Sequence, residues 1–184
     1  SRVNAVLGDA PASDDSDLRS IAHIGTIVST TAIAMAERTG AGGRDVLRAM
    51  VLGYELEGRI DEALTPGRNE RGFHGSISTI FGGAVAAGSL LGLTQAQMTQ
   101  AIALAWTSIG GLMVAANTSG AREYHAVLSE MLGVHAAHAA QKGFVAEETV
   151  LELPRGFFSA YGGAHLDDVT KDLGKEWDIA TNMA

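Results

Sequence analysis

The sequence contains no cysteine and only three prolines. The absence of cysteine excludes disulfide bonds, thiolate zinc sites and cysteine nucleophiles, and it is typical of a reducing compartment. We therefore expect a cytoplasmic protein. The scarcity of proline, together with many alanines and long apolar patterns that repeat every 3.6 residues, is typical of an all-α chain.

Positive charge and long apolar runs are also scarce. The formal net charge is −8, whereas proteins that bind nucleic acids carry a basic face. Glycine, serine, threonine and charged residues interrupt each apolar stretch before it reaches the thickness of a bilayer, and no segment has the pattern of a signal peptide. We expect neither a nucleic-acid partner nor a membrane partner.

Five segments have the length and apolar periodicity of main helices. They cover approximately residues 18–38, 44–63, 77–91, 95–109 and 121–142. Residues 1–16 hold turn and cap residues and predict an irregular segment, and a short last helix is expected over residues 166–173. Because the chain has no repeat and no linker, we expect one bundle-like helical domain over residues 1–184.

The predicted helix over residues 77–91 is rich in small residues. Gly82, Gly83 and Gly88 lie inside it, and interior glycines destabilise a helix unless a neighbour approaches closely. We expect this helix to be the most buried. Just beyond it, Thr94 to Gln97 have the spacing of a capping box that opens the next helix.

The loop over residues 68–76 is the first candidate functional segment. Ser76 is expected to cap the following helix, so that His74 would lie just outside a helix N-terminus, where free backbone N–H groups favour an anion. Arg68 and Arg71 add positive charge to the same loop. The alternative is an ordinary solvated loop whose charges point to water.

A second candidate group combines Asp14, Asp15 and His23. Carboxylates beside an imidazole hold its tautomer and shift its pKa toward a working pH, as general acid–base catalysis requires. The alternative is that the acidic residues are helix caps and that His23 is an ordinary residue of a first turn.

Three histidines, His125, His135 and His138, share one predicted helix and raise the question of a metal site. Ten residues of helix rise by about 15 Å, so His125 cannot bind the same ion as the other two. No obvious carboxylate stands near His135 and His138 as a third ligand. We expect packed or surface histidines and no metal.

Several short motifs follow one another in a recognisable order. They are Asn4 with Asp14-Asp15-Ser16, Ala22-His23-Ile24-Gly25, Ala36-Glu37-Arg38-Thr39-Gly40, Gly53-Tyr54-Glu55, Gly72-Phe73-His74 with Leu90-Leu91-Gly92-Leu93, Tyr124-His125-Ala126, Arg155-Gly156-Phe157, and the run from Leu173-Gly174 to Trp177-Asp178-Ile179. In this order the sequence resembles the MmgE/PrpD family, which includes 2-methylcitrate dehydratases, cis-aconitate decarboxylases and iminodisuccinate epimerases.

The resemblance implies a lyase or isomerase that needs no cofactor and abstracts a proton α to a carboxylate of a small di- or tricarboxylate. The implied catalytic residues are His23, His74, Asp14 and Asp15, with Ser16 and His125 expected to bind the substrate. Because the developing enediolate charge requires nearby cations, we also expect Arg68 and Arg71 to bind the substrate. In that family the helical domain is followed by an α/β lid domain, and we expect residues 1–184 to correspond to part of the helical domain without the lid. We therefore expect a fragment or a subunit that works as a homodimer or with a partner subunit carrying the lid.

The sequence also departs from the family pattern. Val127 and Met131 stand where a glycine and an active-site lysine are expected, Ala12 replaces an aspartate, and Asp9 replaces a histidine. These departures leave open a non-catalytic structural or binding subunit, and they leave open whether residues 1–184 act alone.

Overall fold

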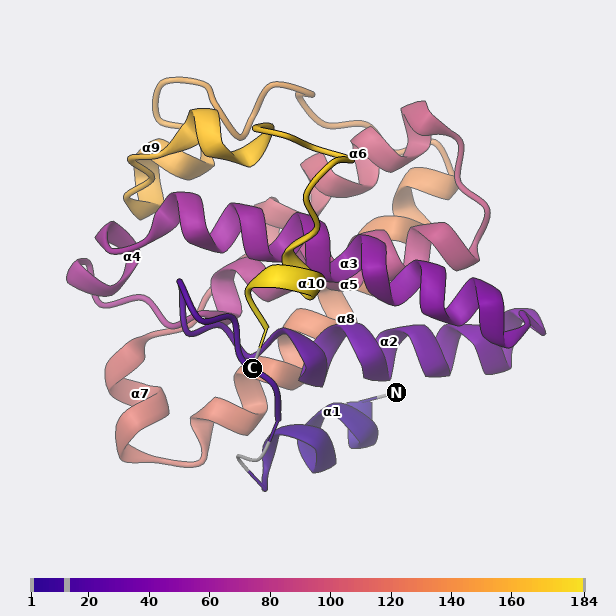
Figure 1. Ribbon diagram of the computed structural model, residues 1–184, viewed down its shortest axis with the longest axis horizontal. Helices are drawn as coiled ribbons and strands as arrows, with labels where there is room; N and C mark the ends of the chain where they lie inside the picture. Colours follow the sequence, from indigo (N-terminus) through magenta and orange to yellow (C-terminus); the bar gives the residue numbers. More distant parts are fainter. Residues whose placement is uncertain (1, 12–13, 184) are drawn as a thin grey trace.

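The computed structural model describes residues 2–11 and 14–183, so Ala12 lies outside the described residues (Figure 1). Within these ranges the chain forms ten α-helices, two short 3₁₀ segments and three isolated β-bridges, and it contains no strand. The all-α prediction is confirmed. None of the helices in these ranges is sufficiently long and apolar to cross a membrane.

The elements are α1 (Arg2–Asp9), α2 (Ile24–Thr39), α3 (Gly43–Leu64), α4 (Gly67–Glu70), α5 (Ser76–Leu90), α6 (Gln95–Ala105), η1 (Trp106–Ser108), α7 (Met113–Thr118), α8 (Ala121–Gln141), α9 (Phe157–Tyr161), η2 (Leu166–Val169) and α10 (Asp178–Thr181). The five longest helices, α2, α3, α5, α6 and α8, are the five main helices that the sequence predicts.

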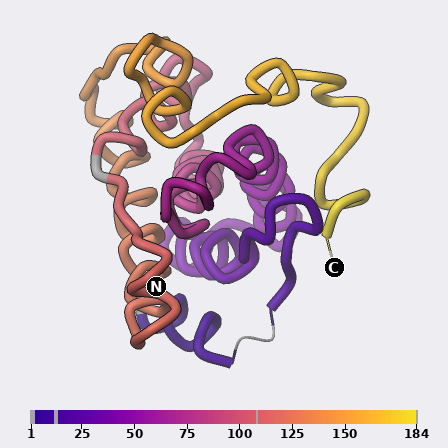
Figure 2. The backbone as a smooth tube through the Cα atoms, turned by 90° about the vertical axis from the view of Figure 1, so that its left-hand side faces the viewer, coloured from indigo at the N-terminus to yellow at the C-terminus, as the bar shows by residue number. Residues whose placement is uncertain are grey.

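Helix α5 is the centre of the domain. It packs against α8, α3, α2 and α6, and Figure 2 shows it between α8 on one side and α3 on the other. Nearly all of its residues are buried. A Cβ atom on Gly133 of α8 would lie 2.8 Å from the backbone nitrogen of Ala84, so the two helices touch through their backbones. The predicted close approach at this small-residue helix is confirmed.

The N-terminal segment differs from the prediction. Residues 1–16 were expected to be irregular, but Arg2–Asp9 form α1. Such a short helix is not stable by itself in water. Its contacts with α8 and α2 supply the stability that its own periodicity does not indicate.

The start of α2 also differs from the prediction. The helix begins at Ile24 and not near residue 18. Asp17 accounts for the difference, because its side chain accepts hydrogen bonds from the backbone N–H groups of Arg19 and Ser20. Such local bonds compete with helix formation. Ile21 then adopts a positive φ of 61°, which is incompatible with a continuous α-helix.

Other helix ends were predicted with mixed success. The Thr94 capping box is present and opens α6. The N-cap of α5 is Gly75 and not Ser76, so the predicted serine cap is wrong. The last predicted helix is only the 3₁₀ segment Leu166–Val169, and the connection before α8 contains the additional helix α7.

Three of the long helices begin close to one another. Residues at or near the starts of α2, α5 and α8 line a common pocket, together with the last residue of α1. The first N–H groups of a helix have no partner within that helix, and the helix dipole adds partial positive charge there. The N-terminal ends of α2, α5 and α8 therefore lie at one pocket, where their partial positive charge favours an anion.

Candidate functional site

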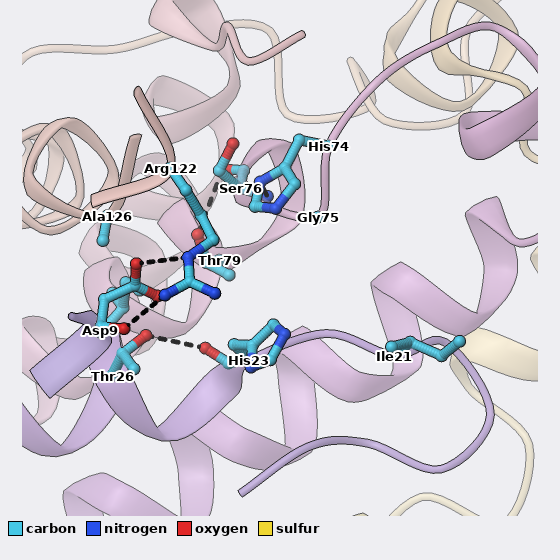
Figure 3. Close-up of a pocket in the computed structure, with 11 residues that line it drawn as sticks. Asp9, Ile21, His23, Thr26, His74, Gly75, Ser76, Thr79, Arg122 and Ala126 are labelled. Atoms are coloured by element: carbon cyan, nitrogen blue, oxygen red, sulfur yellow. Dashed lines mark hydrogen bonds and ion pairs between the residues drawn. The ribbon is translucent and has the colours of Figure 1, made fainter. Parts of the chain in front are cut away.

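The pocket contains about 310 Å³ of space, part of it open to solvent. Figure 3 shows His74 and His23 on different sides of this space, with the side chain of Arg122 extending between them. The residues that line the pocket come from α1, α2, α5 and α8 and from the loops before α2 and α5: Asp9, Ile21, His23, Thr26, Ile27, His74, Gly75, Ser76, Thr79, Arg122 and Ala126. Both histidines and the arginine therefore line the same space.

His23 is the N-cap residue of α2 and is partly buried. Its Nδ1 atom lies 3.0 Å from Oδ2 of Asp14. An ionised carboxylate can only accept, so Nδ1 carries the hydrogen. In the neutral ring the other nitrogen, Nε2, is then a free acceptor, which is the form that a general base requires.

His74 has the opposite arrangement. The backbone N–H of Ser76 donates to Nδ1 of His74 over 3.3 Å, so in the neutral ring Nε2 carries the hydrogen. Burial, helped by the neighbouring positive groups His125 and Arg68, lowers the pKa of His74 to about 4. At neutral pH this ring is an uncharged hydrogen-bond donor.

Arg122 is the one arginine or lysine among the described residues that line the pocket. Its Nε donates to Oδ2 of Asp9 over 3.0 Å, and its Nη2 donates to the backbone oxygen of Asp9 over 2.7 Å. Burial raises the pKa of the Asp9 carboxyl, while the guanidinium of Arg122 opposes that rise. The pair fixes the end of α1 to the start of α8.

Two other predicted site residues, Asp15 and Ser16, lie outside the pocket lining. Asp15 accepts a hydrogen bond of 2.6 Å from the hydroxyl of Tyr54, which fixes this segment to α3. Ser16 is partly buried and is not among the residues that line the pocket. Of the predicted group of Asp14, Asp15 and His23, Asp14 contacts His23, whereas Asp15 contacts Tyr54.

The two arginines of the loop also lie outside the pocket lining. Arg68 is buried and donates to Oδ2 of Asp61 over 2.8 Å and to the backbone oxygen of Ser20. Arg71 is exposed and donates to the backbone oxygens of Ser159 and Ala160. Both side chains hold segments of the chain together.

His125 lies beside the pocket, against His74. The two ring centroids are 5.6 Å apart, with the rings tilted by 43°. Burial lowers the pKa of His125. In the part of the chain that the structure describes, no group of three histidine or acidic side chains has the arrangement of a metal site.

Two residues of the pocket were not predicted as site residues from the sequence. Arg122 was not identified, and Asp9 was noted only as a departure from a motif. A signal for Arg122 was present, because it precedes His125 by three residues and residues three apart share one face of a helix. The pairing with Asp9 spans more than a hundred residues and could not be read from local spacing.

The fold and the pocket define an all-α domain with two histidines at converging helix starts. The sequence matches the model of the MmgE/PrpD N-terminal domain over residues 2–168, so the chain belongs to the MmgE/PrpD family.

Relatives of this chain include three named proteins. A cis-aconitate decarboxylase-like protein, oryM, of Aspergillus oryzae is 28% identical over 180 residues, which are 88% of this chain and 37% of the relative. A cis-aconitate decarboxylase of Aspergillus terreus is 29% identical over 181 residues, which are 95% of this chain and 36% of the relative. The human cis-aconitate decarboxylase is 28% identical over 137 residues, 73% of this chain and 28% of the relative. The chain thus spans about a third of the length of these relatives.

Proposed function

We propose that this chain provides the histidine-bearing part of an active site that abstracts a proton α to the carboxylate of a small substrate. The reaction is of the lyase or isomerase type and uses no cofactor. The observation that carries the proposal is that the two imidazoles lining one pocket have opposite tautomers. Nε2 of His23 is a hydrogen-bond acceptor, and Nε2 of His74 is a donor. The family membership and the lyases among the relatives support it.

His23 is the proposed general base. Its Nδ1 hydrogen is held by Asp14, so its Nε2 lone pair is available to a substrate C–H bond. When Nε2 takes the proton, the ring becomes a cation, and the Asp14 carboxylate stabilises that cation from the other side.

His74 is the proposed neutral acid. Its depressed pKa keeps the ring uncharged, and an uncharged Nε2–H can donate to an oxygen on which charge develops without losing a charge of its own.

Arg122 is the proposed binding group for the substrate carboxylate. Proton removal places two electrons in the bond between the α-carbon and the carboxylate carbon, so an enediolate with additional negative charge forms. A guanidinium beside that group, together with the starts of α2, α5 and α8, stabilises the charge as it develops. Loss of a β-substituent, or return of a proton to the other face, would complete a lyase or isomerase reaction.

The test is exchange of the α-hydrogen in deuterated water, followed by proton NMR on a panel of small mono-, di- and tricarboxylates. His23→Asn is expected to abolish exchange, and His74→Asn to slow it by about 10²-fold or more. His135→Asn is the matched control, because His135 is exposed on α8, about 15 Å of helix from His125. Full exchange in both pocket variants would refute the assignment.

A non-catalytic binding subunit is the second candidate. Met131 favours it, since this half-buried residue of α8 stands where the family resemblance places a lysine. A wild-type protein that binds carboxylates and exchanges none of their α-hydrogens would support this function and overturn the catalytic one.

A further inference from the structure

Residues 17–22, directly before His23, form a closed loop. Oδ1 of Asp17 accepts hydrogen bonds from two backbone N–H groups inside this loop. The backbone N–H of Asp17 in turn donates to the backbone oxygen of Ala22 over 3.0 Å, which joins the two ends of the loop. A displacement of the loop as a unit would therefore move His23, the residue that follows it.

The C-terminal segment, residues 166–183, holds this loop from outside. The backbone N–H of Leu18 donates to the backbone oxygen of Asn182 over 2.7 Å. Nη2 of Arg19 lies 2.9 Å from Oδ1 of Asp178, the first residue of α10, in an ion pair. Figure 2 shows the end of the chain, in yellow, beside the indigo loop. The loop is therefore tied to a part of the chain that is remote in sequence.

Helix α3 fixes the C-terminal segment through a buried ion pair. Nε of Arg59 donates to Oε1 of Glu55 over 2.6 Å, and both side chains are almost completely buried. The guanidinium of Arg59 also donates to the backbone oxygens of Lys171 and Glu176. Oε2 of Glu55 accepts from the backbone N–H of Asp178 over 2.7 Å. These bonds hold in place a segment that has little regular structure of its own.

Asp14 reaches His23 from the other side of the loop and has a different anchor. Asp15, next to it, accepts from the hydroxyl of Tyr54 on α3. The distance of 3.0 Å between Oδ2 of Asp14 and Nδ1 of His23 thus joins two segments that are fixed separately. It depends on the contact with Tyr54 at one end and on the anchor of Arg19 at the other.

We infer that Arg19 and Asp178 are positioning residues for His23. Their ion pair holds the loop where Nδ1 of the imidazole meets Asp14 and Nε2 stays available to a substrate. The inference rests on the proposed function and deepens it, because it makes the geometry of the proposed base depend on the C-terminal segment. Arg19 and Asp178 line a separate polar pocket against α3, so a substitution there leaves the lining of the histidine pocket unchanged.

The experiment compares Arg19→Gln with the wild type by two readouts. Proton NMR measures α-hydrogen exchange on the carboxylate that the wild type exchanges fastest, and nitrogen NMR of the imidazole reports which ring nitrogen of His23 carries the hydrogen. A misplaced base affects the transition state more than ligand binding, so we expect kcat for exchange to fall by about tenfold and KM to stay within about twofold. The ring signals of His23 should move from the Nδ1–H form toward a mixture of tautomers.

Two further variants serve as comparisons. Arg19→Lys keeps a positive charge opposite Asp178 and should recover most of the exchange rate. Arg48→Gln is the matched control, because Arg48 pairs with Asp45 on the exposed surface of α3. It removes the same charge without touching the loop, so it should leave both readouts unchanged.

Asp178→Asn tests the route, because Arg19 also pairs with Glu62 of α3. This variant keeps the size of the side chain and removes its charge. If the two positioning residues act as one unit, the double variant should lose no more exchange rate than Arg19→Gln alone. Losses that add in full would overturn the assignment to this pair. Asp178→Asn is judged by the same two readouts if Arg19→Gln does not fold.

A purely structural role of the pair predicts folded variants of lower stability with the kcat and the His23 tautomer of the wild type, and that result would overturn the inference. If the wild type exchanges no α-hydrogen of any carboxylate, the proposed reaction fails, and the tautomer readout alone decides the positioning. A mixture of tautomers in Arg19→Gln and not in Arg48→Gln would then retain the inference. The same tautomer in both variants would overturn it.

Discussion

His23 and Asp14 form a hydrogen-bonded pair in which Nδ1 lies 3.0 Å from Oδ2, and the side chain of Asp14 is only 10% exposed. If this pair sets the tautomer of the base, Asp14→Asn should lower the rate of α-hydrogen exchange by about 10²–10⁴-fold. The physical reason is that an amide can present its NH₂ group to Nδ1, which would move the ring hydrogen to Nε2. Exchange rates measured by NMR at saturating ligand check this.

Asp15→Asn provides the comparison for that variant. Asp15 is adjacent in sequence, but its carboxylate accepts from Tyr54 outside the pocket lining. We expect this variant to lose about 1 kcal/mol of stability and to keep its exchange rate within a few-fold. Equal loss of rate in both variants would contradict the assignment of the tautomer to Asp14.

His74 should make stability depend on pH. Its pKa is lowered to about 4 in the folded protein, from an ordinary value of 6.5, so between these two values the unfolded chain binds more protons. The contribution of His74 to the free energy of unfolding is therefore complete above pH 6.5, and it is lost as the pH falls from 6.5 to 4. For a partly exposed ring we expect about 1–2 kcal/mol after solvent screening.

The measurement is urea unfolding of wild type and His74→Asn at pH 7 and at pH 4.5. Other groups with shifted pKa values titrate in the same range, so the difference between the two proteins is compared and not either curve alone. The free energy of unfolding of the wild type should fall further than that of the variant on acidification. Parallel curves would show that His74 is protonated equally in both states.

Arg68 and Arg71 should behave differently on substitution. Arg68→Met leaves the carboxylate of Asp61 buried without its ion pair, which is expected to cost about 3–5 kcal/mol. Arg71→Ala removes exposed hydrogen bonds to α9 and should cost less than about 1 kcal/mol. Thermal unfolding compares the two. Weakened carboxylate binding by a folded Arg71→Ala protein would instead favour a substrate-binding arginine, as the sequence suggests.

The contact of α5 with α8 should be intolerant of added volume. A Cβ atom on Gly133 would lie 2.8 Å from the backbone oxygen of Ile80, and a backbone atom cannot move away as a side chain can. Gly133→Ala is expected to destabilise by about 1–3 kcal/mol. Gly43→Ala at the start of α3 is the control, because an added Cβ meets nothing within 4 Å there. Equal stability of the two variants would argue against this close packing.

The long helices were predictable because their information is local. The glycines of α5 indicated a close neighbour, and the spacing from Thr94 to Gln97 indicated a cap, before any tertiary contact was known. Helix α1 was missed for the opposite reason, since its stability comes from packing on α8. The early start assigned to α2 failed because the side chain of Asp17 forms bonds that helical periodicity does not reveal.

The pocket was only partly predictable for the same reason. His74 lies just before a helix start that local patterns indicate, whereas His23 lies at a helix start only because α2 begins at Ile24 and not near residue 18. The ion pair of Asp9 with Arg122 depends on how α1 meets α8, and the buried position of Arg68 depends on Asp61 in α3. Charge alone does not distinguish an arginine that faces a ligand from one that holds two helices together.

Self-association is the remaining prediction. The family resemblance suggested it, because it implies a homodimer or a partner subunit that carries the lid. The apolar faces of α5 are covered by neighbouring helices of the same chain, so they provide no interface. Exposed apolar side chains occur at several places on the surface. One set lies on α1, on the segment that includes α7 and on α8: Val3, Leu7, Leu112, Val114 and Tyr124.

Helices α1 and α7 both pack on α8, and we propose that their apolar side chains join two copies of the chain. Val114→Lys should then weaken association, because burial of a lysine charge in an apolar contact is unfavourable. Leu47→Lys on α3 is the control, since Leu47 is as exposed as Val114 but belongs to another face. Sedimentation equilibrium over a wide range of concentrations measures both. A wild type that remains a monomer throughout, or equal weakening by the two lysines, would contradict this interface.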